Sequence, residues 1–272
     1  TYSLLLAPAL CQAQTITTVA GGYLGNGASA FSMGINPSGI ATDNKGNIYS
    51  ADYSNYVIRK INLSISIMTI VAGDGSLGYS GDGGPATNAQ LFGTGPVAAD
   101  TAGNLFICDY NFYVVRRIDA KTGIITTVCG NGGIGDAGDG GPATAASLYG
   151  PFGITLDDSD NIYLQGGQKI REVNNKTGII TTVAGNDTVY ALRDGGPATD
   201  ACLFDPWNVG VDKAGNIYIT ASNSRLREVY RATGIINTIA GNGVSNYSGD
   251  GGPATAAEFY NCNALAIDTS GN

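Results

Sequence analysis

The sequence predicts an all-β protein made of a structural unit that repeats about every 56 residues, and two observations support this. Glycine is unusually frequent, with 41 in 272 residues, while charged residues make up only 13%. This composition favours many short strands joined by tight turns. The motif Gly-Gly-Pro-Ala recurs every 55 to 57 residues, a fixed period that is typical of repeat architectures. It lies at Gly83–Ala86, Gly140–Ala143, Gly195–Ala198 and Gly251–Ala254.

Each unit is expected to form four short strands. A turn from Asp43 to Gly46 separates the first two strands of the first complete unit, and Asp and Gly suit a hairpin with a positive-φ residue. Four such strands make one twisted antiparallel sheet, which cannot bury both of its faces alone. Stacking the sheets around an axis solves this problem and predicts a β-propeller. In this unit the expected strands are Gly39–Asp43, Ile48–Ala51, Val57–Ile61 and Met68–Ala72.

The phase of the repeat predicts where the blades lie. We expect the propeller to occupy residues 14–272, and a fifth unit to show only its first strand, near Leu265–Asp268. Ile16–Ala20 matches a fourth strand with no unit before it. The expected ring is therefore incomplete at its C-terminal end, and its phase would fit a ring of five blades. Complete blades are expected at about 35–73, 94–130, 151–185 and 206–241.

The N-terminus predicts an exported protein. Leu4–Leu10 is a short apolar run, and the small residues Cys11 and Ala13 follow it as in a signal-peptidase site. We interpret residues 1–13 as the remnant of a signal peptide. The run is too short to span a bilayer, so no membrane insertion is expected. The predicted localisation is secreted, extracellular or in the cell envelope.

Charge and composition argue against several functions. The net charge is −8, and an acidic surface repels phosphate backbones, so nucleic acid is not an expected partner. The sequence contains no histidine, which removes the usual general base and the usual zinc ligand. We therefore expect no enzyme, no metal and no cofactor.

Residues that recur in every unit are interpreted as scaffold. The recurrent acids of the Gly-rich connectors are interpreted as loop residues, with a calcium site as the alternative, because such loops offer carboxylate and carbonyl oxygens. A recurrent arginine on the third strand is interpreted as a structural hydrogen-bond donor. The acids are Asp82, Asp139, Asp194 and Asp250, and the arginines are Arg59, Arg116, Arg171 and Arg227.

The cysteines are also interpreted as structural. Cys108 and Cys129 take places that alanine holds in other units, which predicts buried small residues. A disulfide between Cys202 and Cys262 would join two blades and is not expected.

Positions that differ between units are candidates for binding. The residue at the inner end of the first strand should face the mouth of the central channel, and in adjacent units it is Phe152 and Trp207, followed by Asn208. Two neighbouring aromatic rings could stack on a sugar, a peptide or another flat group. The alternative is that they fill the channel or pack against loops. In the other units this position is Ser38, Gly95 and Asn263.

A second group of candidates follows the second strand. Tyr53, Tyr110 and Tyr113 place aromatic residues on the first two complete blades only. The matching places of Asp52-Tyr53 in the next units are read as Gln165-Gly166 and Ala221-Ser222. Binding faces often show such asymmetry, although drifting repeats show it too.

These motifs resemble those of the NHL repeat family over residues 15–272. They are Asp-x-x-Gly-Asn-Ile-Tyr from Asp43, then Asp52, Asn55 and Ile58–Ile61, and Thr-Gly-Ile-Ile-Thr-Thr-Val-Ala-Gly from Thr177. The Gly-Asp-Gly-Gly-Pro-Ala-Thr connector is similar to the NHL arrays of bacterial secreted proteins. The resemblance implies a propeller of four-stranded blades, with six blades in the ring as the expectation and five as the alternative. A fold alone does not fix a function.

The expected function is a secreted, non-catalytic binding or scaffold module that recognises a protein or a carbohydrate through loops on one face. The alternative is a propeller enzyme of the lyase or calcium-dependent lactonase type, with its catalytic residues outside this sequence. The lyases that the repeat resembles rely on histidine, which this chain lacks.

Overall fold

The computed structural model describes residues 35–43, 45–187, 190–260 and 262–268, and these form an all-β fold. Four antiparallel sheets follow one another along the chain. Blade 1 contains β1 (Pro37–Thr42), β2 (Asn47–Asp52), β3 (Val57–Asn62) and β4 (Ile67–Ala72). Blade 2 contains β5 (Thr94–Ala99), β6 (Leu105–Asp109), β7 (Val114–Ile118) and β8 (Ile125–Cys129). Blade 3 contains β9 (Gly153–Leu156), β10 (Ile162–Gly166), β11 (Lys169–Val173) and β12 (Ile180–Ala184).

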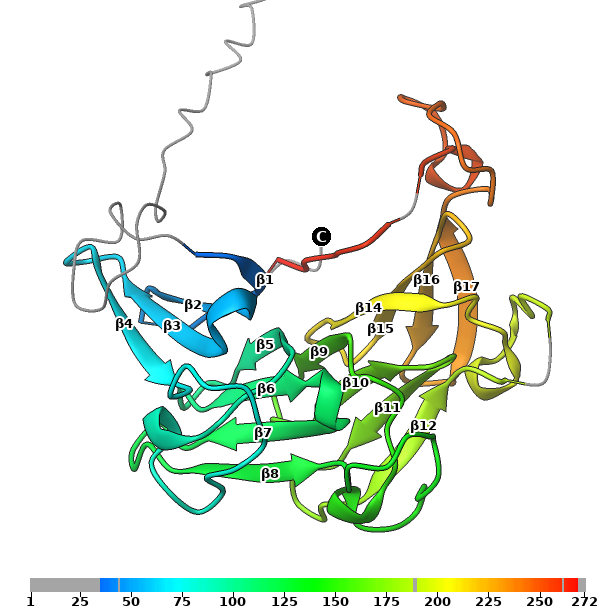
Figure 1. Cartoon of the computed structure of the whole chain (residues 1–272). Helices are drawn as coiled ribbons and strands as arrows, with labels where there is room; N and C mark the ends of the chain where they lie inside the picture. Colours follow the sequence, from blue (N-terminus) through cyan, green and yellow to red (C-terminus); the bar gives the residue numbers. More distant parts are fainter. Residues whose placement is uncertain (1–34, 44, 188–189, 261, 269–272) are drawn as a thin grey trace, which may run out of the picture.

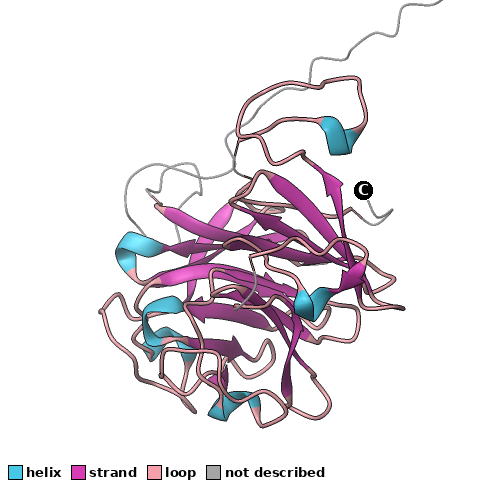
Figure 2. Cartoon of the chain, turned by 90° about the vertical axis from the view of Figure 1, so that its right-hand side faces the viewer, coloured by secondary structure: helices cyan, strands magenta, loops and turns pink. Residues whose placement is uncertain are grey.

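Blade 4 contains β14 (Pro206–Val211), β15 (Ile217–Ala221), β16 (Arg225–Tyr230) and β17 (Ile235–Ala240), with the two-residue β13 (Gly196–Pro197) added to β17. The four sheets fan around a common centre, with β1, β5, β9 and β14 innermost (Figure 1). From the side, the strands form layers and short 3-10 turns lie at their periphery (Figure 2). This arrangement confirms the predicted propeller of four-stranded blades.

The hydrophobic core lies between successive blades. One cluster joins Ile58 of blade 1 to Ile107 and Ile125 of blade 2, and all three side chains are fully buried. The connector between these blades adds Ala86 and Ala89 to the same cluster. Equivalent clusters lie between blades 2 and 3 and between blades 3 and 4. Blades 2 and 3 therefore bury both of their faces against their neighbours, which one sheet could not do alone.

Aspartates fix the first hairpin of each blade. Asp43 accepts hydrogen bonds from the backbone N–H groups of Lys45 (2.8 Å) and Asn47 (2.9 Å) through Oδ1. Burial alone would raise the pKa of Asp43, but these bonds and those of the Asn47 and Tyr49 side chains outweigh it and lower the pKa to about 2. The predicted turn role is confirmed, and it recurs at Asp100, Asp157 and Asp212.

The glycine that ends each fourth strand is required by geometry. Gly130 has a φ of 92°, and a Cβ atom there would lie 2.2 Å from the carbonyl oxygen of Tyr113. A side chain at this position would clash with the backbone of the neighbouring strand. The Ala-Gly that closes each unit therefore reflects a close approach of two backbones.

Each described connector between blades continues along the outermost strand of the next blade. After leaving blade 1, the connector donates from Gly83 N–H to the carbonyl of Ile125 on β8 (2.8 Å), and Gly84 accepts from the Ile125 N–H (3.0 Å). The same pairing makes β13 a partner of β17. We call these paired segments the connector arms. They cover outer sheet edges that would otherwise expose unpaired backbone groups.

Some predictions are wrong or fall outside the described residues. Residues 262–268 carry no strand, so the predicted strand near Leu265–Asp268 is wrong, because no described segment offers it a hydrogen-bonding ladder. The signal-peptide residues 1–13 and the segment Ile16–Ala20 lie outside the described residues. No helix in the described ranges is long and apolar enough to cross a membrane.

The cysteines of the described chain form no disulfide. Cys108, Cys129 and Cys202 are buried, and Cys262 is partly exposed. Burial raises the pKa of the Cys129 thiol to about 12 and that of Cys108 well above its usual value. We expect a thiol reagent at neutral pH to modify Cys262 in the folded protein and to leave the other three unmodified until denaturant is added. Peptide mass spectrometry would show this, and rapid native labelling of Cys108 would contradict the buried placement.

Candidate functional site

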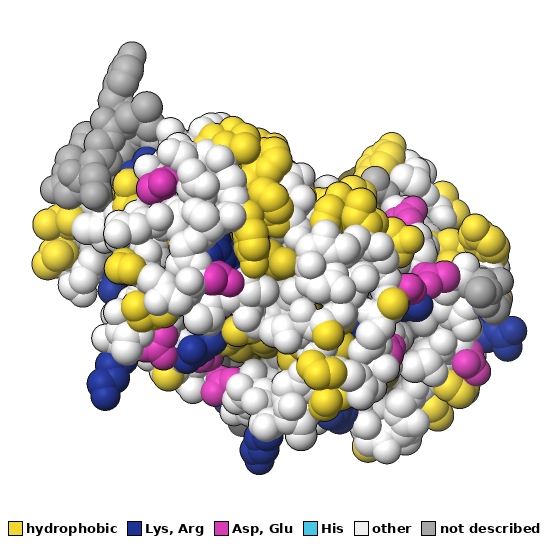
Figure 3. Space-filling model, turned by 60° about the horizontal axis from the view of Figure 1, so that its bottom comes forward, with side chains coloured by type: hydrophobic (Ala, Val, Ile, Leu, Met, Phe, Trp, Pro, Cys, Tyr) yellow, Lys and Arg dark blue, Asp and Glu magenta, His cyan; other side chains and the backbone are white. Residues whose placement is uncertain are grey.

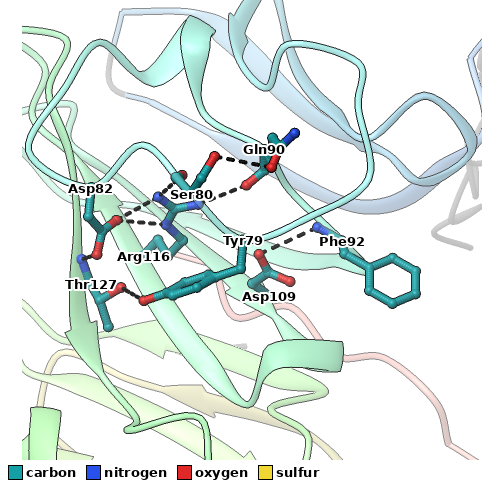
Figure 4. A network of polar contacts seen from close by, with 8 residues as sticks. All are labelled: Tyr79, Ser80, Asp82, Gln90, Phe92, Asp109, Arg116 and Thr127. Carbon is teal, nitrogen blue, oxygen red and sulfur yellow. Dashed lines mark hydrogen bonds and ion pairs between the residues drawn. The ribbon is translucent and has the colours of Figure 1, made fainter.

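Three of the recurrent arginines and three of the connector aspartates form clamps between a connector and the blade that it covers. Figure 4 shows the clamp of blade 2, where Arg116 donates to Asp82 Oδ1 from Nε (3.0 Å) and Nη2 (2.5 Å). Arg116 also donates to the carbonyls of Ser80 (2.8 Å) and Gln90 (3.0 Å). The Thr127 N–H donates to Asp82 Oδ2 at 2.9 Å.

The clamp keeps its aspartate charged. Burial favours the neutral acid, but hydrogen bonds from Thr127 and Arg116 and the Arg116 charge outweigh burial and lower the pKa of Asp82. The same pairs occur at Asp139–Arg171 (2.6 Å) and Asp194–Arg227 (2.5 Å). These acids of the Gly-rich connectors are thus engaged by cations of the chain itself, as a structural role requires.

The turn between the second and third strands differs between blades. Blades 1 and 2 carry a 3-10 turn there, η2 (Tyr53–Asn55) and η4 (Tyr110–Phe112). In blade 3, Gly166 stands opposite Lys169 as Asp52 stands opposite Val57, so only two residues connect the strands. The matching of Asp52-Tyr53 to Gln165-Gly166 was therefore wrong by one residue. The longer turns explain why blades 1 and 2 alone present tyrosines from this place.

Three predicted site residues form a continuous row across three blades. The rings of Tyr53 and Tyr110 are nearly parallel, with an interplanar angle of 3° and centroids 6.4 Å apart. The centroid of Phe152 on blade 3 lies 5.2 Å from that of Tyr110. Tyr53 is 38% exposed and Phe152 is 51% exposed. We call Tyr53, Tyr110 and Phe152 the aromatic row.

A glycine allows Tyr110 to join this row. Gly95 occupies the mouth position of blade 2, and a Cβ atom there would lie 3.1 Å from Cδ1 of the Tyr110 ring. In blade 3 the equivalent position is Phe152 itself. Blade 2 thus supplies its ring from the turn, and blade 3 supplies its ring from the residue before the inner strand β9, so the row continues without a gap. Burial and a hydrogen bond with Tyr53 raise the pKa of Tyr110 to about 12.

The remaining predicted site residues lie apart from the row. Trp207 is 44% exposed on blade 4, and its carbonyl oxygen, rather than its ring, lies against Gly153. The expected pairing of Phe152 with Trp207 is replaced by that of Phe152 with Tyr110. Tyr113 ends η4 in the left-handed conformation, with a φ of 54°, and packs against the core between blades 2 and 3. Its side chain has a packing role.

A cavity of about 710 Å³ opens at the centre of the blades. It is lined by the inner strands and by residues 263–267, and blade 4 contributes residues 208–211, among them the predicted site residue Asn208. The described lining residues include Ser38, Phe152 and Asn263 but no charged side chain. On the face drawn in Figure 3, Lys and Arg side chains lie scattered among acidic and uncharged ones. In the described ranges, no three Cys, Asp or Glu side chains come together so as to hold a metal ion.

A second group of rings lies beside the row, and sequence reasoning did not assemble it. Phe92 stands between Tyr56 and Phe112, with centroid distances of 6.2 and 6.0 Å. Tyr79 of the connector lies 5.1 Å from Phe112, and the Arg116 guanidinium lies 5.0 Å from the Tyr79 ring. This group attaches the connector to blade 2. It could not be found from the repeat, because its members come from two repeats.

Asp109 and its counterpart Asp52 have different hydrogen-bond partners, although both end the second strand of their blade. Asp52 is fully buried and accepts hydrogen bonds from Asn55 Nδ2 (2.9 Å) and Arg59 Nε (2.8 Å). In blade 2, Phe112 replaces the asparagine, and Arg116 bonds to Asp82 instead.

Asp109 is equally buried, and the backbone N–H of Phe92, 3.5 Å from Oδ2, is the only donor found for it among the described residues. Its Oδ1 atom has no partner there. Burial raises the pKa of Asp109 to about 7, against the opposing effects of the Phe92 N–H and the Arg116 charge.

Comparison with known proteins supports the interpretation of the roughly 56-residue unit as an NHL-type repeat. The family model of the teneurin NHL domain matches residues 129–193, which contain all of blade 3. NHL repeat-containing protein 2 of Gallus gallus is 25% identical over 292 aligned residues, which cover 95% of this chain and 40% of that protein. Teneurin-3 of Danio rerio is 35% identical over 103 residues, or 34% of this chain and 4% of that protein. This chain therefore spans less than half the length of either relative.

A solved structure gives the same fold. The structure of a nidogen/laminin complex superposes with a TM-score of 0.52 at 15% sequence identity, covering 75% of this chain and 65% of that chain. Fold and repeat together define a β-propeller whose blades are built from one recurring sequence unit. The family model and the relatives support an NHL-repeat β-propeller.

Proposed function

We propose that this propeller is an extracellular, non-catalytic recognition module whose ligand binds the aromatic row. The observation that carries the proposal is the row itself. Large rings from three separate blades lie side by side and partly exposed, although nothing in the blade scaffold requires a ring at these positions. Exposed groups of aromatic residues are typical of binding surfaces.

The relatives support the extracellular and binding parts of this proposal. The matching family model is a domain of teneurins, and the superposed structure is that of a nidogen/laminin complex. A propeller of this architecture can therefore present a face to a protein partner. The uncharged lining of the central cavity favours binding over acid–base chemistry at the mouth, because proton transfer needs titratable side chains.

The test is binding by a double variant, Tyr110→Ala with Phe152→Ala, against a panel of immobilised extracellular-matrix proteins and glycans. We expect the unaltered chain to bind at least one member, and the double variant to bind it about tenfold or more weakly. Tyr190→Ala is the control, because Tyr190 is 88% exposed in a connector outside the row. Equal binding by the unaltered chain and the double variant would show that the ligand uses another surface.

A further inference from the structure

We infer that the aromatic row takes a neutral carbohydrate, with sugar rings stacked on Tyr110 and Phe152. This inference rests on the proposed function and names the class of ligand. The aromatic row and the uncharged central cavity meet at Phe152, which belongs to both. The site therefore combines a stacking surface with a polar but uncharged wall.

The stacking surface suits the apolar side of a sugar ring. The C–H groups on one side of a pyranose are weakly positive, and the face of an aromatic ring is weakly negative, so the two attract each other. Phe152 offers half of its surface to solvent, and Tyr110 lies between Phe152 and Tyr53 along the row. Because the three rings come from three blades, the surface suits a chain of sugar units better than a single unit.

The wall of the cavity supplies hydrogen-bonding groups without charge. Ser38 provides a hydroxyl, while Asn208 and Asn263 provide amides. The strands β1, β5, β9 and β14 stand at the inner edges of their sheets, so main-chain groups on those edges lie outside the sheet ladders. Sugar hydroxyls both donate and accept hydrogen bonds and can use all of these groups.

The absence of charged side chains from the described lining distinguishes between classes of ligand. A uronic acid, a sulfated sugar or a lysine-rich peptide would lose hydration at this wall and would find no opposite charge there. A neutral sugar carries no such cost. The chemistry of the lining therefore favours neutral hexose or N-acetylhexosamine chains over charged glycans and charged peptides.

Trp207 provides a fluorescent reporter near the row. It is the only tryptophan of the sequence, and its backbone lies against Gly153, the residue after Phe152. We would titrate the whole chain with cellohexaose, mannohexaose and N,N′-diacetylchitobiose oligomers and follow Trp207 fluorescence, with calorimetry as a second measurement. Oligogalacturonate, a chitosan oligomer and a tyrosine-rich neutral peptide are the comparison probes.

We expect at least one neutral oligosaccharide to bind, with less than about a twofold change in Kd between about 0.05 and about 0.5 M NaCl, because no ion pair forms. Phe152→Ala should weaken binding about tenfold. Gly95→Ala should weaken it several-fold by displacing the Tyr110 ring while leaving every ring present, because its added Cβ would lie 3.1 Å from that ring. Tyr190→Ala should have no effect.

Different results would contradict the carbohydrate ligand and the recognition site. If no neutral oligosaccharide binds at millimolar concentration, or if one binds equally well to Phe152→Ala, the carbohydrate inference is wrong. If the peptide or a charged glycan binds instead, and Phe152→Ala abolishes that binding, the aromatic row is a recognition site for another class of ligand. Loss of binding in Gly95→Ala is interpretable only if its thermal unfolding matches that of the unaltered chain, so both are measured together.

Discussion

Replacing Asp109 with asparagine is expected to stabilise the protein at about pH 8, by up to about 4 kcal/mol, the value of three pKa units. Asp109 is buried, and its pKa is raised from 3.8 to about 7. Below about pH 4 the acid is protonated in both the folded and the unfolded chain. Between about pH 4 and about pH 7 the unfolded chain releases this proton while the folded chain keeps it, so stability falls as pH rises. Above about pH 7 both the folded and the unfolded chain release the proton, so the stability falls no further.

The measurement is urea unfolding of the wild type and Asp109→Asn at several pH values between about 4 and about 8. The difference between the two free energies of unfolding isolates this residue, because the other titrating groups are common to both proteins. The difference should grow with pH in favour of the variant and level off near pH 8. A difference that is constant with pH would contradict the unpaired, buried carboxylate.

Asp52→Asn is the matched control, since Asp52 holds the same place in blade 1. This aspartate accepts hydrogen bonds from Arg59 at 2.8 Å and from Asn55, so its negative charge is paired with an arginine. Removing that charge beside a buried arginine is expected to cost about 3 kcal/mol at neutral pH. The same substitution should thus have opposite signs in two neighbouring blades.

Replacing Arg116 with lysine is expected to lower the free energy of unfolding by about 3 kcal/mol and to free the connector of residues 74–93. The guanidinium is fully buried and donates in three directions, to Asp82 and to the carbonyls of Ser80 and Gln90. A lysine ammonium cannot reproduce this planar fork, so at least one buried acceptor loses its donor. Backbone groups of the connector would then exchange with solvent more readily.

Arg117→Lys is the control for this prediction because Arg117 is the next residue on the same strand. Its side chain and that of its partner Asp119 are each 31% exposed. A surface pair of this kind contributes less than about 1 kcal/mol. Hydrogen exchange of the Gly83 N–H, which bonds to Ile125 on β8, would report whether the connector has loosened. Unchanged exchange in Arg116→Lys would show that the connector does not depend on the clamp.

The strands and hairpin turns could be predicted from the sequence because they depend on residues close together in the chain. Asp43 and Asn47, four residues apart, fix the first hairpin, and the pattern repeats in every blade. The role of the recurrent arginines as hydrogen-bond donors followed in the same way. Their partners did not, because Arg116 and Asp82 lie 34 residues apart, and the equivalent Arg59 bonds instead to Asp52 in its own blade.

Three of the predicted site residues, Tyr53, Tyr110 and Phe152, lie together in the structure, but their grouping was not predicted. Phe152 was expected beside Trp207 because both hold the mouth position in adjacent units. The structure pairs it with Tyr110, because Gly95 leaves room for a ring that comes from a turn. Tyr113 could not be separated from Tyr110 by sequence, since only the left-handed end of the 3-10 turn directs it to the core. Such differences depend on backbone direction, which residue type alone does not specify.

Because of the connector arms, the segment that carries a blade with its covered outer edge begins before the first strand of that blade's sheet. A blade cut out at the ends of its four strands would lack the arm that seals its outer edge, and it would offer that edge to any other chain. A graft that begins at Gly73 and ends at Cys129 would carry blade 2 with its own seal and its Arg116–Asp82 clamp. A duplication that respects this offset copies each sheet together with the arm that covers its outer edge. A duplication cut at the sheet boundaries copies sheets whose outer edges are left unpaired.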